Sequence, residues 1–364
     1  MQPENKVWTI HEIWNQAMDE SEPRQIEPRD RVWASELWKQ DLDVVLKLKG
    51  IQPTNEPNAR AIRKMEMGEW FEQGFSNMLK RAGILKDSQQ RIERPADDKH
   101  IAISGRIDFI AGGNVDDLQV EAVQNSDLPA RFRKAGLKIV EHLKEKYKEG
   151  FPVNVIEFKT SSLMAFEKVD STKKPLAGHD LQLFHYVHNL NMAGSIIYFC
   201  KDDARMVQIP VMPDDQRLKD LYFGKLARIK SYIDSGTLPT KESIILWDAD
   251  NKKFTQNLNV RYSSYLTRNY KLKDESEYEE VISPIVSKWN RIIPRILAGK
   301  EMTKSNEDHI KDMLSLGFDI FMLLGRTRDN YVDLADKTVK EEDIVVILPT
   351  VHEVFAEQQK TAEL

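Results

Sequence analysis

Three ionisable residues in the middle of the sequence have types and spacing that suit metal-assisted chemistry. Asp108 lies near the end of one alternating apolar segment, and Glu157 and Lys159 flank Phe158 in a second. In a strand, side chains at i and i+2 share a face, so Glu157 and Lys159 would enter one pocket while Phe158 turns into the core. Two carboxylates and the Phe158 carbonyl can hold magnesium, which lowers the pKa of water, and the lysine adds a positive charge. This combination suits phosphodiester hydrolysis.

A polar pair follows further along the chain. Gln182 and Tyr186 are four residues apart in a helical pattern and so share one face. An amide and a hydroxyl there can hydrogen-bond a phosphate or the ligands of a metal. The alternative is a half-buried helix whose tyrosine belongs to the core.

Each of these three residues also has a purely structural interpretation. Asp108 can cap the turn before Gly112 and Gly113. Glu157 and Lys159 can belong to an exposed alternating strand, but four apolar neighbours indicate a largely buried strand, where an unpaired charge is costly: Val153, Val155, Ile156 and Phe158.

The elements that must position these residues alternate between strands and helices. Alternating apolar residues predict strands at 101–110, 118–123, 153–159, 195–200 and 206–211. Helical spacing predicts helices at 10–18, 32–49, 59–83, 129–149, 180–190, 216–234, 276–298 and 304–325.

The order of these motifs resembles the RecB-like branch of the PD-(D/E)XK nucleases. In that branch a Gly-x-x-Asp strand, a hydrophobic-Glu-x-Lys strand and a Gln-x-x-x-Tyr helix follow one another, and here they read GRID, IEFK and QLFHY. An upstream helix of the branch has a Gly followed four residues later by an acid or histidine near the metal, which matches Gly68 and Glu72. The resemblance covers residues 60–235 and looks closest to phage-encoded exonucleases and the CRISPR-adaptation nucleases.

The resemblance implies a fold and an activity. It implies an α/β core with a mixed sheet flanked by helices, comprising residues 59–239 with an insertion at about 112–152. A helical segment at 1–58 precedes this core, and a mostly helical region of unknown role follows at 240–364. The implied activity is Mg²⁺-dependent DNA hydrolysis, with Mn²⁺ as a substitute, by an exonuclease acting at linear or single-stranded DNA ends.

Further expectations concern the setting and the rival functions. The resemblance also implies a role in phage or bacterial recombination, repair or DNA processing, with a helicase or recombinase as a partner. One rival is a structure- or sequence-specific endonuclease on the same core. The other is a catalytically inactive DNA-binding or assembly protein.

The composition and the motifs of the sequence exclude several other classes of protein. The chain has 364 residues, is 30% charged and carries a net charge of -5. A single cysteine, Cys200, excludes a disulfide framework, a zinc-thiolate site and a protein-ligated iron–sulfur cluster, which many CRISPR-adaptation members carry. Neither a membrane-spanning apolar run nor a secretory signal occurs, so we expect a cytoplasmic protein that does not enter membranes. No P-loop or dinucleotide-binding glycine motif is present.

Three further features have two interpretations each. The helix at 129–149 carries many cations and is either a solvated face or a DNA-contacting face. The segment 261–270 alternates aromatics with cations and is either a single-strand stacking surface or a buried turn. The three histidines of the motif helix are expected to be surface or groove residues rather than zinc ligands: His179, His185 and His188.

Overall fold

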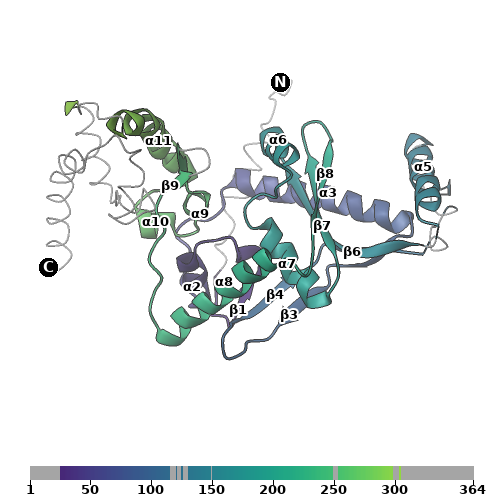
Figure 1. Cartoon of the computed structure of the whole chain (residues 1–364), viewed down its shortest axis with the longest axis horizontal. Helices are drawn as coiled ribbons and strands as arrows, with labels where there is room; N and C mark the ends of the chain where they lie inside the picture. The colour runs from purple at the N-terminus through teal and green to yellow at the C-terminus, as the bar shows by residue number, and fades with distance from the viewer. Residues whose placement is uncertain are drawn as a thin grey trace, which may run out of the picture. The chain divides into compact units, whose positions relative to one another are not determined.

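The computed structural model describes residues 25–114, 120, 124–125, 130–148, 150–248, 253–297 and 303–304. The chain divides into two compact units, Met1–Gln52 with Glu56–Pro239, and Pro53–Asn55 with Thr240–Leu364. Figure 1 shows their elements. None of the described helices combines the length and the apolar character needed to cross a membrane.

A five-stranded sheet forms the centre of the first unit. Its strand order is β2-β5-β6-β7-β8, with β6 and β7 parallel and every other pair antiparallel. The strands are β2 (Leu85–Ser88), β5 (Phe109–Gly113), β6 (Phe151–Ser161), β7 (Gly194–Cys200) and β8 (Met206–Val211). This mixed sheet, flanked by helices, confirms the predicted α/β fold class.

Alternation along β6 separates the two faces of this sheet. Phe158 packs toward α3 (Ala59–Arg81), in a cluster with Phe75 and Phe109. Val155 faces the larger core on the other side, together with Leu183 of α7 (His179–Leu190). That core also contains residues of α2 (Asp41–Leu48), α6 (Leu163–Thr172) and α8 (Gln216–Ser235). The residues beside Phe158 therefore face away from α3's aromatic cluster.

A smaller sheet continues from the first through a bend. It has the order β1-β4-β3 and comprises β1 (Arg31–Trp33), β4 (Ala102–Arg106) and β3 (Arg91–Arg94). The strand predicted at 101–110 is therefore two strands, β4 and β5, with Ile107 and Asp108 between them. Opposite this bend, Gln89 has a φ of 59°, and its N–H donates to the carbonyl of Asp108 at 3.3 Å. A left-handed residue of this kind kinks a strand pair, as bulges do.

The helix predicted at 32–49 is wrong in its first half. Residues there form β1, a short 3-10 helix η1 (Ala34–Glu36) and, after a break, α2. Val32 pairs with Ile103 of β4, so a contact with a distant strand overrides the local helical spacing. Local spacing likewise did not predict β2, β3 or α6.

The other predicted elements of this unit match the structure closely. The predicted helix at 129–149 is α5 (Ala130–Lys146), and α3, α7, α8, β6, β7 and β8 lie within a few residues of their predicted bounds. The segment 10–18 lies outside the described residues, as do nearly all of 118–123 and of 304–325.

The second unit contains a two-stranded sheet and helices. The elements are β9 (Ile245–Asp248), β10 (Lys253–Gln256), α9 (Leu258–Arg261), α10 (Leu266–Tyr270) and α11 (Glu275–Leu297). Arg261 forms ion pairs with Glu275 and Glu279 of α11, and Tyr265 and Tyr270 are buried. Of the two interpretations of 261–270, burial is correct for these two tyrosines, whereas Tyr262 is 45% exposed.

Candidate active site

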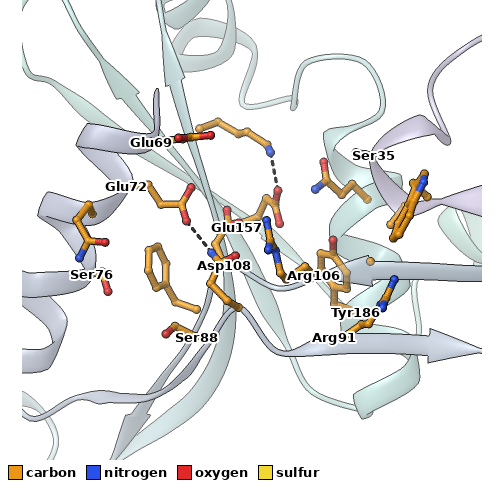
Figure 2. Close-up of a pocket in the computed structure, with 18 of the residues that line it drawn as sticks. Ser35, Glu69, Glu72, Ser76, Ser88, Arg91, Arg106, Asp108, Glu157 and Tyr186 are labelled. Carbon is orange, nitrogen blue, oxygen red and sulfur yellow. Dashed lines mark hydrogen bonds and ion pairs between the residues drawn. The ribbon is translucent and has the colours of Figure 1, made fainter. Parts of the chain in front are cut away.

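A cavity of about 930 Å³ lies between α3, the bend and α7. Figure 2 shows Glu72, Asp108 and Glu157 facing the same space from α3, the bend and β6. Six of the seven residues singled out from the sequence line this cavity: Glu72, Asp108, Glu157, Lys159, Gln182 and Tyr186. The seventh, Phe158, has its side chain on the opposite face of β6, where its ring stacks on that of Phe75 with 4.8 Å between centroids.

Asp108 connects the bend to the neighbouring strand. Its Oδ2 accepts a hydrogen bond of 2.8 Å from the backbone N–H of Phe158. Burial raises the pKa of this carboxyl, although the charge of Lys159 and the Phe158 hydrogen bond oppose the shift. Asp108 therefore lies directly beside the Glu157–Lys159 segment, although 49 residues separate it from Glu157 in the sequence.

Glu157 and Lys159 form a close ion pair inside the cavity. The Lys159 Nζ lies 2.5 Å from the Glu157 Oε1, and Glu157 is completely buried. Burial raises the pKa of Glu157 to about 8. Burial alone would lower the pKa of Lys159, but the carboxylates of Glu157 and Asp108 raise it above its ordinary value. The ion pair thus favours the charged form of Lys159, while burial disfavours the charged form of Glu157.

One oxygen of this pair remains unsatisfied. The Glu157 Oε2 is buried and has no hydrogen-bond partner among the residues that the structure describes. A buried carboxylate oxygen without a partner is destabilising by roughly 1–3 kcal/mol or more. A carboxylate oxygen that is buried at the wall of a cavity without a hydrogen-bond partner is suited to binding a cation.

Glu72 reaches the same cavity from α3. Its Oε1 accepts a hydrogen bond of 2.8 Å from the side chain of Gln89, the residue with the left-handed backbone. Burial, followed by the charge of Asp108, raises the pKa of Glu72 to about 7. The raised value indicates that Glu72 and Asp108 repel each other when both are ionised.

Tyr186 packs against the glycine of the Gly-Arg-Ile-Asp motif. A Cβ placed at Gly105 would lie 2.6 Å from the Tyr186 Cε1 and 2.7 Å from its hydroxyl oxygen. Burial raises the pKa of Tyr186, so its hydroxyl keeps its proton, and Gln182 hydrogen-bonds it. The ring is buried, as the structural interpretation predicted, while the hydroxyl end and Gln182 line the cavity.

The three histidines of α7 do not all lie where they were expected. The prediction of a surface or groove position is wrong for His185, which is completely buried. Its Nδ1 lies 2.9 Å from the Tyr222 hydroxyl and its Nε2 3.1 Å from the Ile92 carbonyl, and these polar partners make the buried position tolerable. His179 and His188 are half-buried.

Sequence reasoning missed several residues of the cavity wall. Arg106 lies inside the motif, is exposed, and has a charge that acts on both Glu72 and Asp108. Its position two residues before Asp108 was the available signal. No signal in the sequence pointed to Gln89 or to the β1–η1 segment, because they reach the cavity only through the bend and through strand pairing.

The donors present suit a hard divalent cation. Asp108 and Glu157 offer carboxylate oxygens, one of them without a partner, and Mg²⁺ is held in many sites by one or two carboxylates with water and phosphate oxygens. Within the described ranges, no three His, Cys, Asp or Glu side chains cluster closely enough to form a metal site by themselves. An ion here would therefore depend on the two carboxylates and on water or substrate.

Comparison with known proteins gives a limited likeness. No known family and no curated protein matches the sequence. The alkaline exonuclease LHK-Exo from Laribacter hongkongensis is 13% identical over 62% of this chain and 95% of its own, with a TM-score of 0.35. The same exonuclease in complex with dAMP is 14% identical over the same shares, with a TM-score of 0.35. The geometry of the cavity, rather than this likeness, is the basis for the proposed activity.

Proposed function

We propose that this chain is a magnesium-dependent nuclease of the PD-(D/E)XK type that hydrolyses DNA from its ends. The observation that carries the proposal is the pairing of Glu157 with Lys159 beside Asp108, with one buried carboxylate oxygen left without a partner. A structural ion pair would use both oxygens of the glutamate, because leaving one unpaired in the core is destabilising.

The residues of the chain have distinct parts in this reaction. Asp108, Glu157 and the carbonyl of Phe158 would hold the ion, with Glu72 on the α3 side. When bound, magnesium lowers the pKa of water and offsets the negative charge that builds on the phosphate oxygens. Mn²⁺, which also prefers oxygen ligands, is expected to substitute.

Lys159 acts by its charge. Since the surrounding carboxylates raise its pKa, the ammonium remains protonated and orients the attacking water or stabilises the pentavalent phosphate electrostatically. The hydroxyl of Tyr186 and the amide of Gln182 donate hydrogen bonds to phosphate oxygens. The Tyr186 hydroxyl keeps its proton at neutral pH, because burial raises its pKa further.

The action from DNA ends and the biological setting are parts of the proposal that rest on the sequence motifs. We propose that the protein processes linear DNA during recombination or repair in a bacterium or a phage-infected cell. A helicase or a recombinase would present the DNA end. The iron–sulfur cluster of some similar nucleases has no counterpart, because the chain has a single cysteine.

The test is degradation of end-labelled linear DNA, single- and double-stranded, beside a covalently closed circle. Wild-type protein is assayed with magnesium, with manganese and with EDTA, together with the Lys159→Ala variant. As a matched control, Lys168→Ala removes an exposed lysine from α6. We expect progressive shortening of linear DNA, an intact circle, and no activity with EDTA or in Lys159→Ala.

Other outcomes separate the rivals. Cutting of the circle that also depends on Lys159 would keep the site but replace the exonuclease with an endonuclease. Equal cutting by Lys159→Ala, or none with either metal, would refute the catalytic assignment. In that case a DNA-binding protein without nuclease activity becomes the better description.

A further inference from the structure

The helix α5 concentrates positive charge in an otherwise acidic chain. Residues 130–146 contain six cations and two glutamates, a net charge of +4, against -5 for the whole chain, so that the rest of the chain carries -9. A solvated helix of an acidic protein has no physical reason to collect cations to this extent. Local concentration of one charge is typical of surfaces that bind an ion of the opposite sign.

The cations of α5 are available to a partner. Lys134, Lys138 and Lys144 are exposed, and none of them has an ion pair or hydrogen bond with any residue that the structure describes. At 100° per residue these three span about 120° of the helix surface, in a sector that begins about 40° from the buried Val140 and that we call the lysine side. The lysine side of α5 therefore faces solvent, while Val140 packs inward and Ile139 is 44% exposed.

The strand β6 connects α5 to the candidate active site, so its length indicates how far apart the two lie. α5 ends shortly before β6 begins at Phe151, and Glu157 lies six residues further along that strand. Figure 1 shows α5 beyond the end at which β6 starts. Since strand residues are about 3.3 Å apart, the start of β6, which follows the near end of α5 in the chain, is about 20 Å from Glu157.

We propose that the lysine side of α5 binds the phosphate backbone of duplex DNA about six base pairs from the bond that is cut. This inference rests on the proposed function, because it takes the Glu157 cavity as the place of cutting. The spacing follows from the rise of duplex DNA, about 3.4 Å per base pair, over a separation of about 20 Å. The contact is to phosphates, so it adds affinity without sequence preference.

An anionic membrane surface is the other polyanion that a basic amphipathic helix can bind. Such helices insert their apolar face among the lipid chains. In α5 that face includes Val140, which is 1% exposed and already packed within the protein. Val140 is therefore not free to insert into lipid, whereas the three lysines are exposed, and this favours DNA.

The experiment measures binding to two DNA hairpins in EDTA, in which the proposed nuclease does not cut. Both hairpins have one open end, with stems of about 5 and about 20 base pairs, so only the longer reaches α5 at about 3.4 Å per base pair. The test variant is Lys134→Gln/Lys138→Gln/Lys144→Gln. The matched control, Lys168→Gln/Lys174→Gln/Lys219→Gln, removes the same charge from exposed positions elsewhere in the unit.

We expect a selective loss on the longer stem. The α5 variant should bind it at least about tenfold more weakly, and the slope of log affinity against log salt should fall by about 2.7, or 0.9 for each lost phosphate contact. Binding to the short stem and binding by the control variant should match those of the wild type.

Three results would overturn the proposal. Equal losses in both triple variants would show general electrostatics, and equal losses on both stems would place the contact at the cavity itself. Unchanged DNA binding, with binding to phosphatidylserine vesicles lost in the α5 variant, would assign the helix to membranes. A wild type that binds the longer stem through α5 but cuts no DNA would refute the nuclease proposal alone.

Discussion

At the scale of single residues, the unusual feature is a carboxylate that is buried without a full set of partners. Glu157 has one oxygen against Lys159 and one with no partner in the described structure. Burial shifts the pKa of Glu157 and Glu72 upward, toward neutrality. Such groups are destabilising in the folded protein and are expected at sites that bind a ligand.

Binding of a divalent cation should stabilise the protein through these carboxylates. Ca²⁺ at about 100 times its dissociation constant is expected to add about 2.7 kcal/mol to the free energy of unfolding. Thermal denaturation with and without Ca²⁺ measures this effect. The increase should disappear in Asp108→Asn and Glu157→Gln and persist in Asp220→Asn, an exposed carboxylate of α8. An equal increase in all four proteins would mean that the ion binds elsewhere.

At the scale of elements, the bend between β4 and β5 and its contact with α7 assemble the site. Gly105 allows the Tyr186 ring to lie against β4, and the bend places Asp108 beside β6. The contact at Gly105 does not tolerate an added side chain, since protein interiors are closely packed.

Two glycine substitutions should therefore act in opposite directions. Gly105→Ala places a methyl group 2.6 Å from Tyr186, so we expect a loss of about 1–3 kcal/mol in the free energy of unfolding and a loss of nuclease activity. Gly74→Ala, in the exposed interior of α3 with nothing near its added Cβ, should stabilise by about 0.5–1 kcal/mol. Urea denaturation measures both, and a Gly105→Ala protein as stable as the wild type would contradict the packing argument.

At the scale of the whole molecule, stability depends on pH through groups that burial has shifted in opposite directions. Burial lowers the pKa of His185 to about 4 and raises that of Glu157 to about 8. The buried histidine contributes stability that is complete above the unfolded pKa of about 6.5 and is lost as pH falls toward 4, because the unfolded chain takes up the proton first. The glutamate acts in the reverse direction, so the two contributions must be separated by substitution.

Replacing His185 should reduce the decrease in the free energy of unfolding that accompanies acidification. His185→Gln is expected to be less stable than the wild type at pH 7, with the difference shrinking by on the order of 2 kcal/mol by pH 4.5, at up to about 1.4 kcal/mol per pH unit. Urea denaturation across this range gives the values. His142→Gln, at an exposed position of α5, is the control and should parallel the wild type. A His185→Gln difference that stays constant with pH would show that His185 titrates normally.

Local periodicity was enough to predict most of the elements that carry the site. Alternation in 153–159 and helical spacing in 180–190 correspond to β6 and α7, and Glu157 and Lys159 share a face as the period of a strand requires. The grouping of this pair with Asp108, Gln182 and Tyr186 came instead from the resemblance of the motif order to a known family. The period of the strand and the helical spacing, by contrast, are local. These properties depend only on near neighbours in the chain, so one sequence contains them.

Only the tertiary structure decided the contacts between distant segments. The bend at Asp108 depends on Gln89 across the hairpin, β1 exists because it pairs with β4, and Gly105 is needed because Tyr186 approaches it. The unpartnered oxygen of Glu157 is likewise a property of everything packed around it. Strand pairing and burial sum contributions from residues far apart in the chain, and local spacing carries no record of them.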